Sequence, residues 1–121
     1  MPQISVEYSE SLTDAFDRRG FALALHAAAQ ELLGSAPTAF KTRFRTTGET
    51  VIGDGDPSEA MVHVGLAILP GRDAETKTKL GELTQTLLAA HLKPAADLNT
   101  QLTVEIRDLA DAYSKTVIAR A

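Results

Sequence analysis

The chain has 121 residues, of which 44% are hydrophobic and 23% charged, which is enough apolar material for the modest core of one domain. A formal net charge of −4 argues against a nucleic-acid partner, and the absence of cysteine excludes disulfides, thiol nucleophiles and thiolate metal sites. Since no apolar run reaches membrane-spanning length and the start lacks the layout of a signal peptide, we expect a cytoplasmic protein with no membrane partner.

The first half of the chain predicts a strand, a helix and a second strand. Residues 3–8 alternate between apolar and polar side chains, as a half-buried strand does. Ser11 and Asp14 are expected to cap the helix that follows, and Gly34 to end it. Its inner face is predicted from the helical spacing of four apolar residues: Phe21, Leu25, Ala28 and Leu32. Alternation returns at 38–46 and predicts the second strand.

The second half repeats this order after a glycine-rich and acidic excursion at 47–59, in which Val51 and Ile52 suggest a short edge strand. Residues 61–69 and 101–107 again alternate as strands. Between them Asp73 is expected to cap a helix, which Pro94 ends. The predicted inner stripe of this helix contains Leu80, Leu83, Leu87 and His91.

This order predicts an α+β fold made of two consecutive βαβ units, about 2–46 and 60–109, with a C-terminal tail at 110–121. Right-handed crossovers give parallel pairs, so the two units join into one mixed four-stranded sheet with both helices on one face. The other face then carries small and oppositely charged side chains, among them Glu7, Gly65 and Glu105. We expect further copies of the chain to cover it in a closed ring, with the glutamates pairing with arginines across strands or subunits.

Four stretches carry a resemblance to a known family through their order and spacing: PQISVEYSESL, FKTRF, GDGDPSEAMVHVGLAI and PGRDAETK. With the strand that begins at Pro2 and the two βαβ units, they resemble the tautomerase superfamily, and within it the 5-carboxymethyl-2-hydroxymuconate isomerase family, along nearly the whole chain. The resemblance implies a homotrimeric isomerase that interconverts the enol and keto forms of a 2-hydroxymuconate-type dicarboxylate or tricarboxylate. It implies Pro2 as the catalytic general base, with cationic side chains on the substrate carboxylates.

The resemblance also suggests which cations bind substrate. Arg72 matches the arginine that the family places in the turn before the second helix, and Lys41 and Arg43 occupy a strand where the family pattern is arginine, a small residue and arginine. Lys41 supplies a point charge where arginine would supply a planar guanidinium with two parallel donors. This difference puts the exact substrate preference in question. The chemistry requires only a proline amine whose pKa is lowered by burial and nearby cations. No metal, nucleotide or flavin cofactor is expected.

Each assignment has a simpler structural alternative. Arg43 is equally suited to an ion pair with Glu7 or Glu105, Arg72 to a turn contact near Asp73, and Lys41 to solvation of an edge strand. The three histidines are expected to pack or lie at the surface, without the spacing of a metal site. The rival function is a non-catalytic oligomeric binding module of ferredoxin-like type. Removal of Met1 separates the two hypotheses, because only the catalytic one requires a free Pro2 amine.

Overall fold

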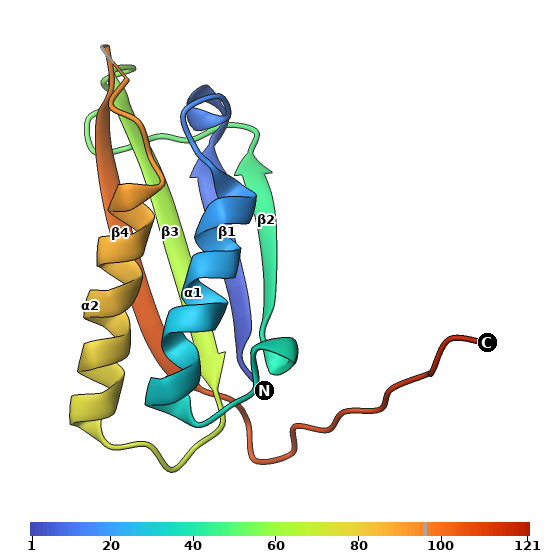
Figure 1. The fold of residues 1–121 in the computed structure, drawn as a ribbon. Helices are drawn as coiled ribbons and strands as arrows, with labels where there is room; N and C mark the ends of the chain where they lie inside the picture. The colour runs from blue at the N-terminus through green and yellow to red at the C-terminus, as the bar shows by residue number, and fades with distance from the viewer. Residues whose placement is uncertain (96) are drawn as a thin grey trace.

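The chain forms four strands and two long helices in this computed structural model, which describes residues 1–95 and 97–121 (Figure 1). Short 3-10 helices at Glu10–Leu12 and Pro37–Ala39 precede α1 and β2. In chain order the main elements are β1 (Gln3–Ser9), α1 (Arg18–Leu33), β2 (Lys41–Thr47), β3 (Glu59–Ile68), α2 (Ala74–Ala90) and β4 (Asn99–Asp108). Within the described ranges, none of the helices combines the length and apolarity needed to cross a membrane.

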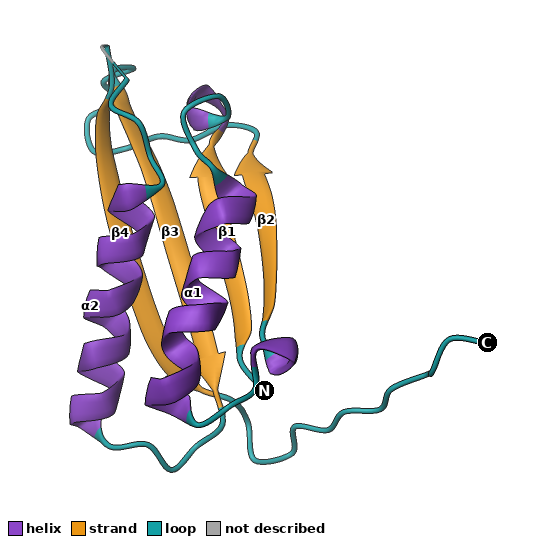
Figure 2. Ribbon diagram, in the orientation of Figure 1, coloured by secondary structure: helices purple, strands orange, loops and turns teal. Residues whose placement is uncertain are grey.

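The strands make one four-stranded sheet in the order β2-β1-β3-β4. β1 pairs with β2 and β3 with β4 in parallel, whereas the central pair of β1 and β3 is antiparallel. Both long helices lie on the same face of this sheet (Figure 2). The predicted fold class is therefore confirmed. Because β1 and β2 are parallel neighbours, both strands begin at the same end of the sheet.

The core lies between the helices and the inward sheet face. Ile4, Val6 and Tyr8 of β1 are buried there, as the alternation predicts. On α1 the buried stripe is different from the predicted one in its second half, where Ala29 and Leu33 replace Ala28 and Leu32. The stripe thus advances by four residues at each step, and it tilts slowly around the helix because a turn takes 3.6 residues.

The second helix shows the same kind of shift. Its fully buried positions are Leu80, Thr84 and Leu88, with Leu83 and Leu87 packed only partly against the core. Thr84 was not predicted inside because a hydroxyl usually stays at the surface. Its Oγ1 donates a 2.7 Å hydrogen bond to the Leu80 carbonyl oxygen, which satisfies the hydroxyl within the helix.

Two local predictions about the first helix and the excursion are wrong. Asp17, and neither Ser11 nor Asp14, caps α1, since its carboxylate accepts a hydrogen bond from the Gly20 N–H at 3.1 Å. No strand forms at residues 51–52 of the described chain. Instead the Gly55 N–H donates to the Ile52 carbonyl at 2.9 Å and closes a turn, which removes that carbonyl from any strand pairing.

The cap predicted for the second helix is confirmed. The Asp73 carboxylate accepts a 2.8 Å hydrogen bond from the Thr76 N–H. This backbone bond, followed by a contribution from the Thr76 side chain, lowers the pKa of Asp73 from its ordinary 3.8. Because the folded-state pKa lies below the unfolded one, the ionised cap stabilises the fold above the unfolded pKa, and this stabilisation is lost as the pH falls through the folded pKa.

Substituting Asp73→Ala is accordingly expected to lower the melting temperature at pH 7, and the difference from the wild type should shrink below about pH 3.8 as the cap becomes protonated. Thermal unfolding followed by circular dichroism across pH measures this difference. Asp14→Ala is the control, because that exposed carboxylate does not cap α1. Equal melting temperatures for the wild type and Asp73→Ala at pH 7 would contradict the prediction.

Candidate active site

The N-terminus lies at the end of the sheet where β1 and β2 begin and β3 ends (Figure 1). Pro2 is buried there, immediately before β1, and its carbonyl oxygen accepts a 3.2 Å hydrogen bond from the Lys41 N–H. Met1 is half-buried beside it. The residue predicted as the catalytic base is thus held by the backbone hydrogen bond that joins the start of β2 to the residue before β1.

Cationic side chains converge on the N-terminal amine. Burial lowers the pKa of the Met1 amine below its ordinary 8.0, and the positive charges of Arg72, Lys41 and Lys115 lower it further, in that order of effect. Both causes act against the ammonium form, because water is removed and like charges are brought near. The position therefore favours a neutral amine and also attracts anions.

Arg72 reaches this position from the turn between β3 and α2. Gly71 precedes it with φ of 114°, a conformation that few other residues adopt, so the glycine sets the path of this turn. The Arg72 guanidinium donates to the carbonyl oxygens of Leu69 at 3.0 Å and Leu33 at 2.6 Å. It thereby ties the end of β3 to the end of α1, and it holds a fixed charge near the amine.

Lys41 approaches the amine from the first residue of β2. Its ammonium donates a 3.0 Å hydrogen bond to the carbonyl oxygen of Ala39 and remains exposed. Gln3 is its partner across the parallel pair of strands. Two of the predicted substrate-binding residues therefore act at the N-terminus: Arg72 from the turn between β3 and α2, and Lys41 from the start of β2.

Arg43 lies one step further along the same face of β2 and does not belong to the group that acts on the amine. Its guanidinium donates to the Gln3 Oε1, at 3.1 Å from Nη1. The same glutamine donates from Nε2 to the Tyr113 hydroxyl at 3.0 Å. Within the described chain Arg43 forms no ion pair with Glu7 or Glu105. Its structural role is therefore to hold Gln3.

Lys115 was missed by the sequence analysis. It lies in the C-terminal segment after β4, outside any periodic pattern, and its Nζ is 3.5 Å from the Met1 sulfur. Contacts between the two ends of the chain, 114 residues apart in sequence for Lys115 and Met1, bring this lysine to the site. A charged residue in an irregular tail gives no signal from which that position can be deduced.

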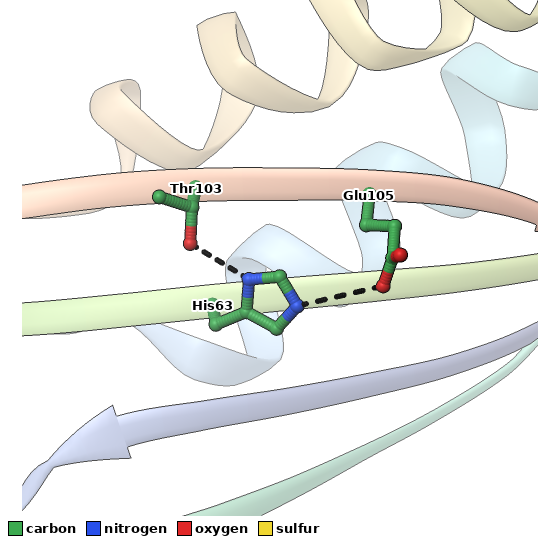
Figure 3. A network of polar contacts seen from close by, with 3 residues as sticks. All are labelled: His63, Thr103 and Glu105. Carbon is green, nitrogen blue, oxygen red and sulfur yellow. Dashed lines mark hydrogen bonds and ion pairs between the residues drawn. The ribbon is translucent and has the colours of Figure 1, made fainter.

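The sheet face without helices carries the residues that the alternation placed there. The register aligns Ser5 with Gly65, and Gly65 with Glu105, in one row across the sheet. In the neighbouring row the His63 Nδ1 is 2.7 Å from the Thr103 hydroxyl, and its Nε2 is 4.0 Å from Glu105 (Figure 3). Within the described chain Glu105 therefore lies beside a histidine and not beside an arginine, and its pairing with an arginine of another subunit stays a prediction.

No group of three or more candidate metal-ligating side chains occurs within residues 1–95 and 97–121.

Comparison with known proteins decides the family. The model of the 5-carboxymethyl-2-hydroxymuconate isomerase family matches residues 2–119. The chain belongs to this family. It is accordingly a keto–enol isomerase, and the alternative of a non-catalytic binding module is set aside. No match was found among curated proteins.

Solved structures agree with this assignment. A 5-carboxymethyl-2-hydroxymuconate isomerase from Deinococcus radiodurans R1 is 26% identical, with a TM-score of 0.69 over 96% of this chain and 88% of that one. A 5-carboxymethyl-2-hydroxymuconate delta-isomerase is 19% identical, with a TM-score of 0.81 over 97% and 88%. A protein described as a fused 4-OT wild-type symmetric trimer is 20% identical, with a TM-score of 0.74 over 94% and 90%. The delta-isomerase and the fused trimer are similar to this chain in fold.

Proposed function

We propose that Pro2, once Met1 is removed, is the general base of a tautomerase that converts the enol form of a 2-hydroxymuconate-type dicarboxylate or tricarboxylate into its keto form. The observation that carries this proposal is that the charges of Arg72 and Lys41 act on the half-buried Met1 amine, whose pKa burial and these charges lower, one residue before the buried Pro2. A neutral amine next to fixed positive charge is what enol deprotonation requires, since the base must be free and the product anion stabilised.

The reaction needs one proton carrier. The Pro2 nitrogen takes the proton of the substrate 2-hydroxyl group, and the electron pair of the O–H bond moves into the conjugated system as a dienolate. The positive charges of Arg72 and Lys41 stabilise this anion while it exists. The prolinium then returns the proton to a carbon of the dienolate, which yields the 2-oxo isomer and regenerates the neutral amine. Atoms and charge balance without a cofactor.

Substrate recognition follows from the same cations. Arg72 retains guanidinium donors beyond the two that bind backbone carbonyls, and a planar fork suits a carboxylate. Lys41 supplies a compact charge with three donors, of which one is used by the Ala39 carbonyl. A substrate with a carboxylate near the reacting enol fits this pair, and lysine at 41 makes the geometry less strict than a second arginine would.

The open sheet face supports assembly into a homotrimer. On its two central strands Ser5 lies opposite Gly65, and Ala67 lies opposite Gln3, so these positions of the face carry small side chains over which another subunit can pack. Parallel strand pairs are usually covered on both faces, whereas the two helices of this chain cover only one. A fused protein of similar fold is described as a symmetric trimer. We infer the same assembly for this chain.

Processing of the N-terminus tests the proposal directly. Intact-mass measurement sorts preparations into those that retain Met1 and those that begin at Pro2, and the ketonisation of a 2-hydroxymuconate dienol is then followed by ultraviolet absorbance. We expect activity only in the fraction that begins at Pro2, because a retained Met1 turns the Pro2 nitrogen into a non-basic amide. Full activity in protein that retains Met1 would end the proline mechanism.

A further inference from the structure

The C-terminal tail crosses the end of the sheet at which the chain begins (Figure 1). After β4 ends at Asp108, the Leu109 N–H donates a 2.7 Å hydrogen bond to the Ile68 carbonyl oxygen at the end of β3. The Tyr113 N–H then donates to the Ala110 carbonyl at 3.0 Å, which closes a turn. These bonds direct the tail from the β3 end of the sheet toward the N-terminus.

A side-chain contact fixes the tail beside the first strand. The Tyr113 hydroxyl accepts a 3.0 Å hydrogen bond from the Gln3 Nε2, and the Gln3 Oε1 accepts from Arg43. The two polar ends of one glutamine thus join β2, β1 and the tail. Because this contact lies only two residues before Lys115, it limits how far that lysine can move from the N-terminus.

Of the three cations at the site, Lys115 has the weakest hydrogen-bond acceptor as its partner. Arg72 donates to two backbone carbonyls and Lys41 to one, whereas the Lys115 Nζ contacts the Met1 sulfur at 3.5 Å. A thioether is a weak acceptor, and this one leaves with Met1. In the described chain Lys115 forms no ion pair, in contrast to Lys77 with Asp108 and Lys79 with Glu75.

We propose that Lys115 is a substrate-binding residue, which holds a second carboxylate of the substrate after Met1 has been removed. The inference rests on the proposed function and goes beyond it in assigning a role to the C-terminal tail. A 2-hydroxymuconate-type substrate has carboxylates at both ends, and one end is held by Arg72 and Lys41 near the amine. Lys115 then makes the site selective for substrates with more than one carboxylate, because a monocarboxylate has no group to offer it.

The lysine also acts on the amine through its charge. In the chain that begins at Met1, Lys115 is one of the cations that lower the pKa of the Met1 amine, after burial, Arg72 and Lys41, and we expect it to act in the same way on the adjacent Pro2 amine once Met1 is removed. Removing the charge should therefore raise the amine pKa slightly and move the acid limb of the pH–rate profile to higher pH. A purely structural role of the tail would leave that limb in place.

The test compares Lys115→Gln and Lys115→Arg on two enol substrates. With the dicarboxylate 2-hydroxymuconate we expect Lys115→Gln to raise KM by about 5-fold to 10-fold, since one charged contact to substrate is lost. With the monocarboxylate enol of phenylpyruvate, KM should change less than about 2-fold. Lys115→Arg keeps the positive charge and should restore most of the affinity for the dicarboxylate.

Lys93→Gln serves as the matched control, because it removes an exposed lysine at the other end of the sheet, beside Ala15. It should leave both KM values unchanged. Equal KM values for the wild type and Lys115→Gln on 2-hydroxymuconate would overturn the inference, as would an equal rise on both substrates.

A binding measurement separates this inference from the proposed function. Isothermal titration of the inert tricarboxylate propane-1,2,3-tricarboxylate needs no turnover, so it is informative even if the Pro2 mechanism fails. We expect protein that begins at Pro2 to bind this probe about 5-fold more tightly than the same protein with Lys115→Gln. Identical affinities in the two proteins would refute a role for Lys115 in carboxylate binding, whatever the activity assays give.

Discussion

Substituting Pro2→Ala should lower kcat for ketonisation of 2-hydroxymuconate by about 100-fold or more, which is the usual loss when a positioned general base is compromised. Alanine still allows a free N-terminal amine. This amine is primary and less basic, and it lacks the ring that is buried at the start of β1. The loss should fall on kcat more than on KM, because the cations that bind the substrate remain. Progress curves under saturating substrate measure the effect.

The matched control for Pro2→Ala is Pro57→Ala, an exposed proline in the excursion before β3, at the opposite end of the sheet. It should keep the wild-type rate. Both variants should keep the oligomeric state of the wild type by analytical ultracentrifugation, so that a lower rate reports on the amine alone. A Pro2→Ala enzyme with the wild-type kcat would remove Pro2 from the mechanism.

The pH dependence follows from the same amine. Burial and the positive charges of Arg72, Lys41 and Lys115 lower the pKa of the Met1 amine below its ordinary 8.0. We expect the Pro2 amine, once freed beside the same cations, to be lowered for the same reasons, so that the neutral base is present at a lower pH than in an unfolded chain. Activity is therefore expected to rise with pH and to reach its plateau with a midpoint below the ordinary value of a terminal amine.

The alternating segments were sufficient to predict the sheet from the sequence. Every strand follows a run in which apolar and polar residues alternate, as Ile4, Val6 and Tyr8 do in β1, and a period of two assigns each residue to a face. The residues of the open face follow from that assignment, whereas the register that sets Ser5 opposite Gly65 in the antiparallel pair of β1 and β3 was not predicted.

The helix faces were harder to predict because small and polar residues give little signal. Ala28 and Ala29 are equally small, and only packing against the sheet shows that Ala29 is the buried one. Thr84 is buried because its hydroxyl bonds within the helix, which no hydropathy pattern reveals. The cap at Asp17 was missed because two earlier polar residues, Ser11 and Asp14, also satisfy the capping pattern.

The site was only partly predictable for a topological reason. Pro2 lies just before β1, Lys41 begins β2 and Arg72 lies in the turn after β3, and the order of the elements places these three positions at one end of the sheet. Lys115 follows no element, and it reaches the site through the contact between Tyr113 and Gln3. Arg43 was predicted on the correct face, but its guanidinium is occupied by the same glutamine.

Arg72→Ala should produce the second large effect, a rise of about 10-fold to 100-fold in KM for 2-hydroxymuconate, because a charge-assisted contact to the substrate carboxylate is lost. The acid limb of the pH–rate profile should also move to higher pH, since Arg72 is the first of the charges that lower the amine pKa. Steady-state kinetics over a pH series measure both effects. Arg19→Ala, an exposed arginine at the far end of α1, is the control and should change neither.

The structural contacts of Arg72 require a second variant to separate binding from stability. The guanidinium bonds to the Leu69 and Leu33 carbonyls, so Arg72→Ala should also lower the free energy of unfolding by about 1 kcal/mol, measured by urea denaturation. Arg72→Lys keeps the charge but loses the fork. It should therefore leave the acid limb near its wild-type position while KM still rises, because lysine cannot bind backbone carbonyls and a carboxylate in the same geometry. An unchanged KM in Arg72→Ala, with stability lowered as expected, would assign Arg72 to the turn alone.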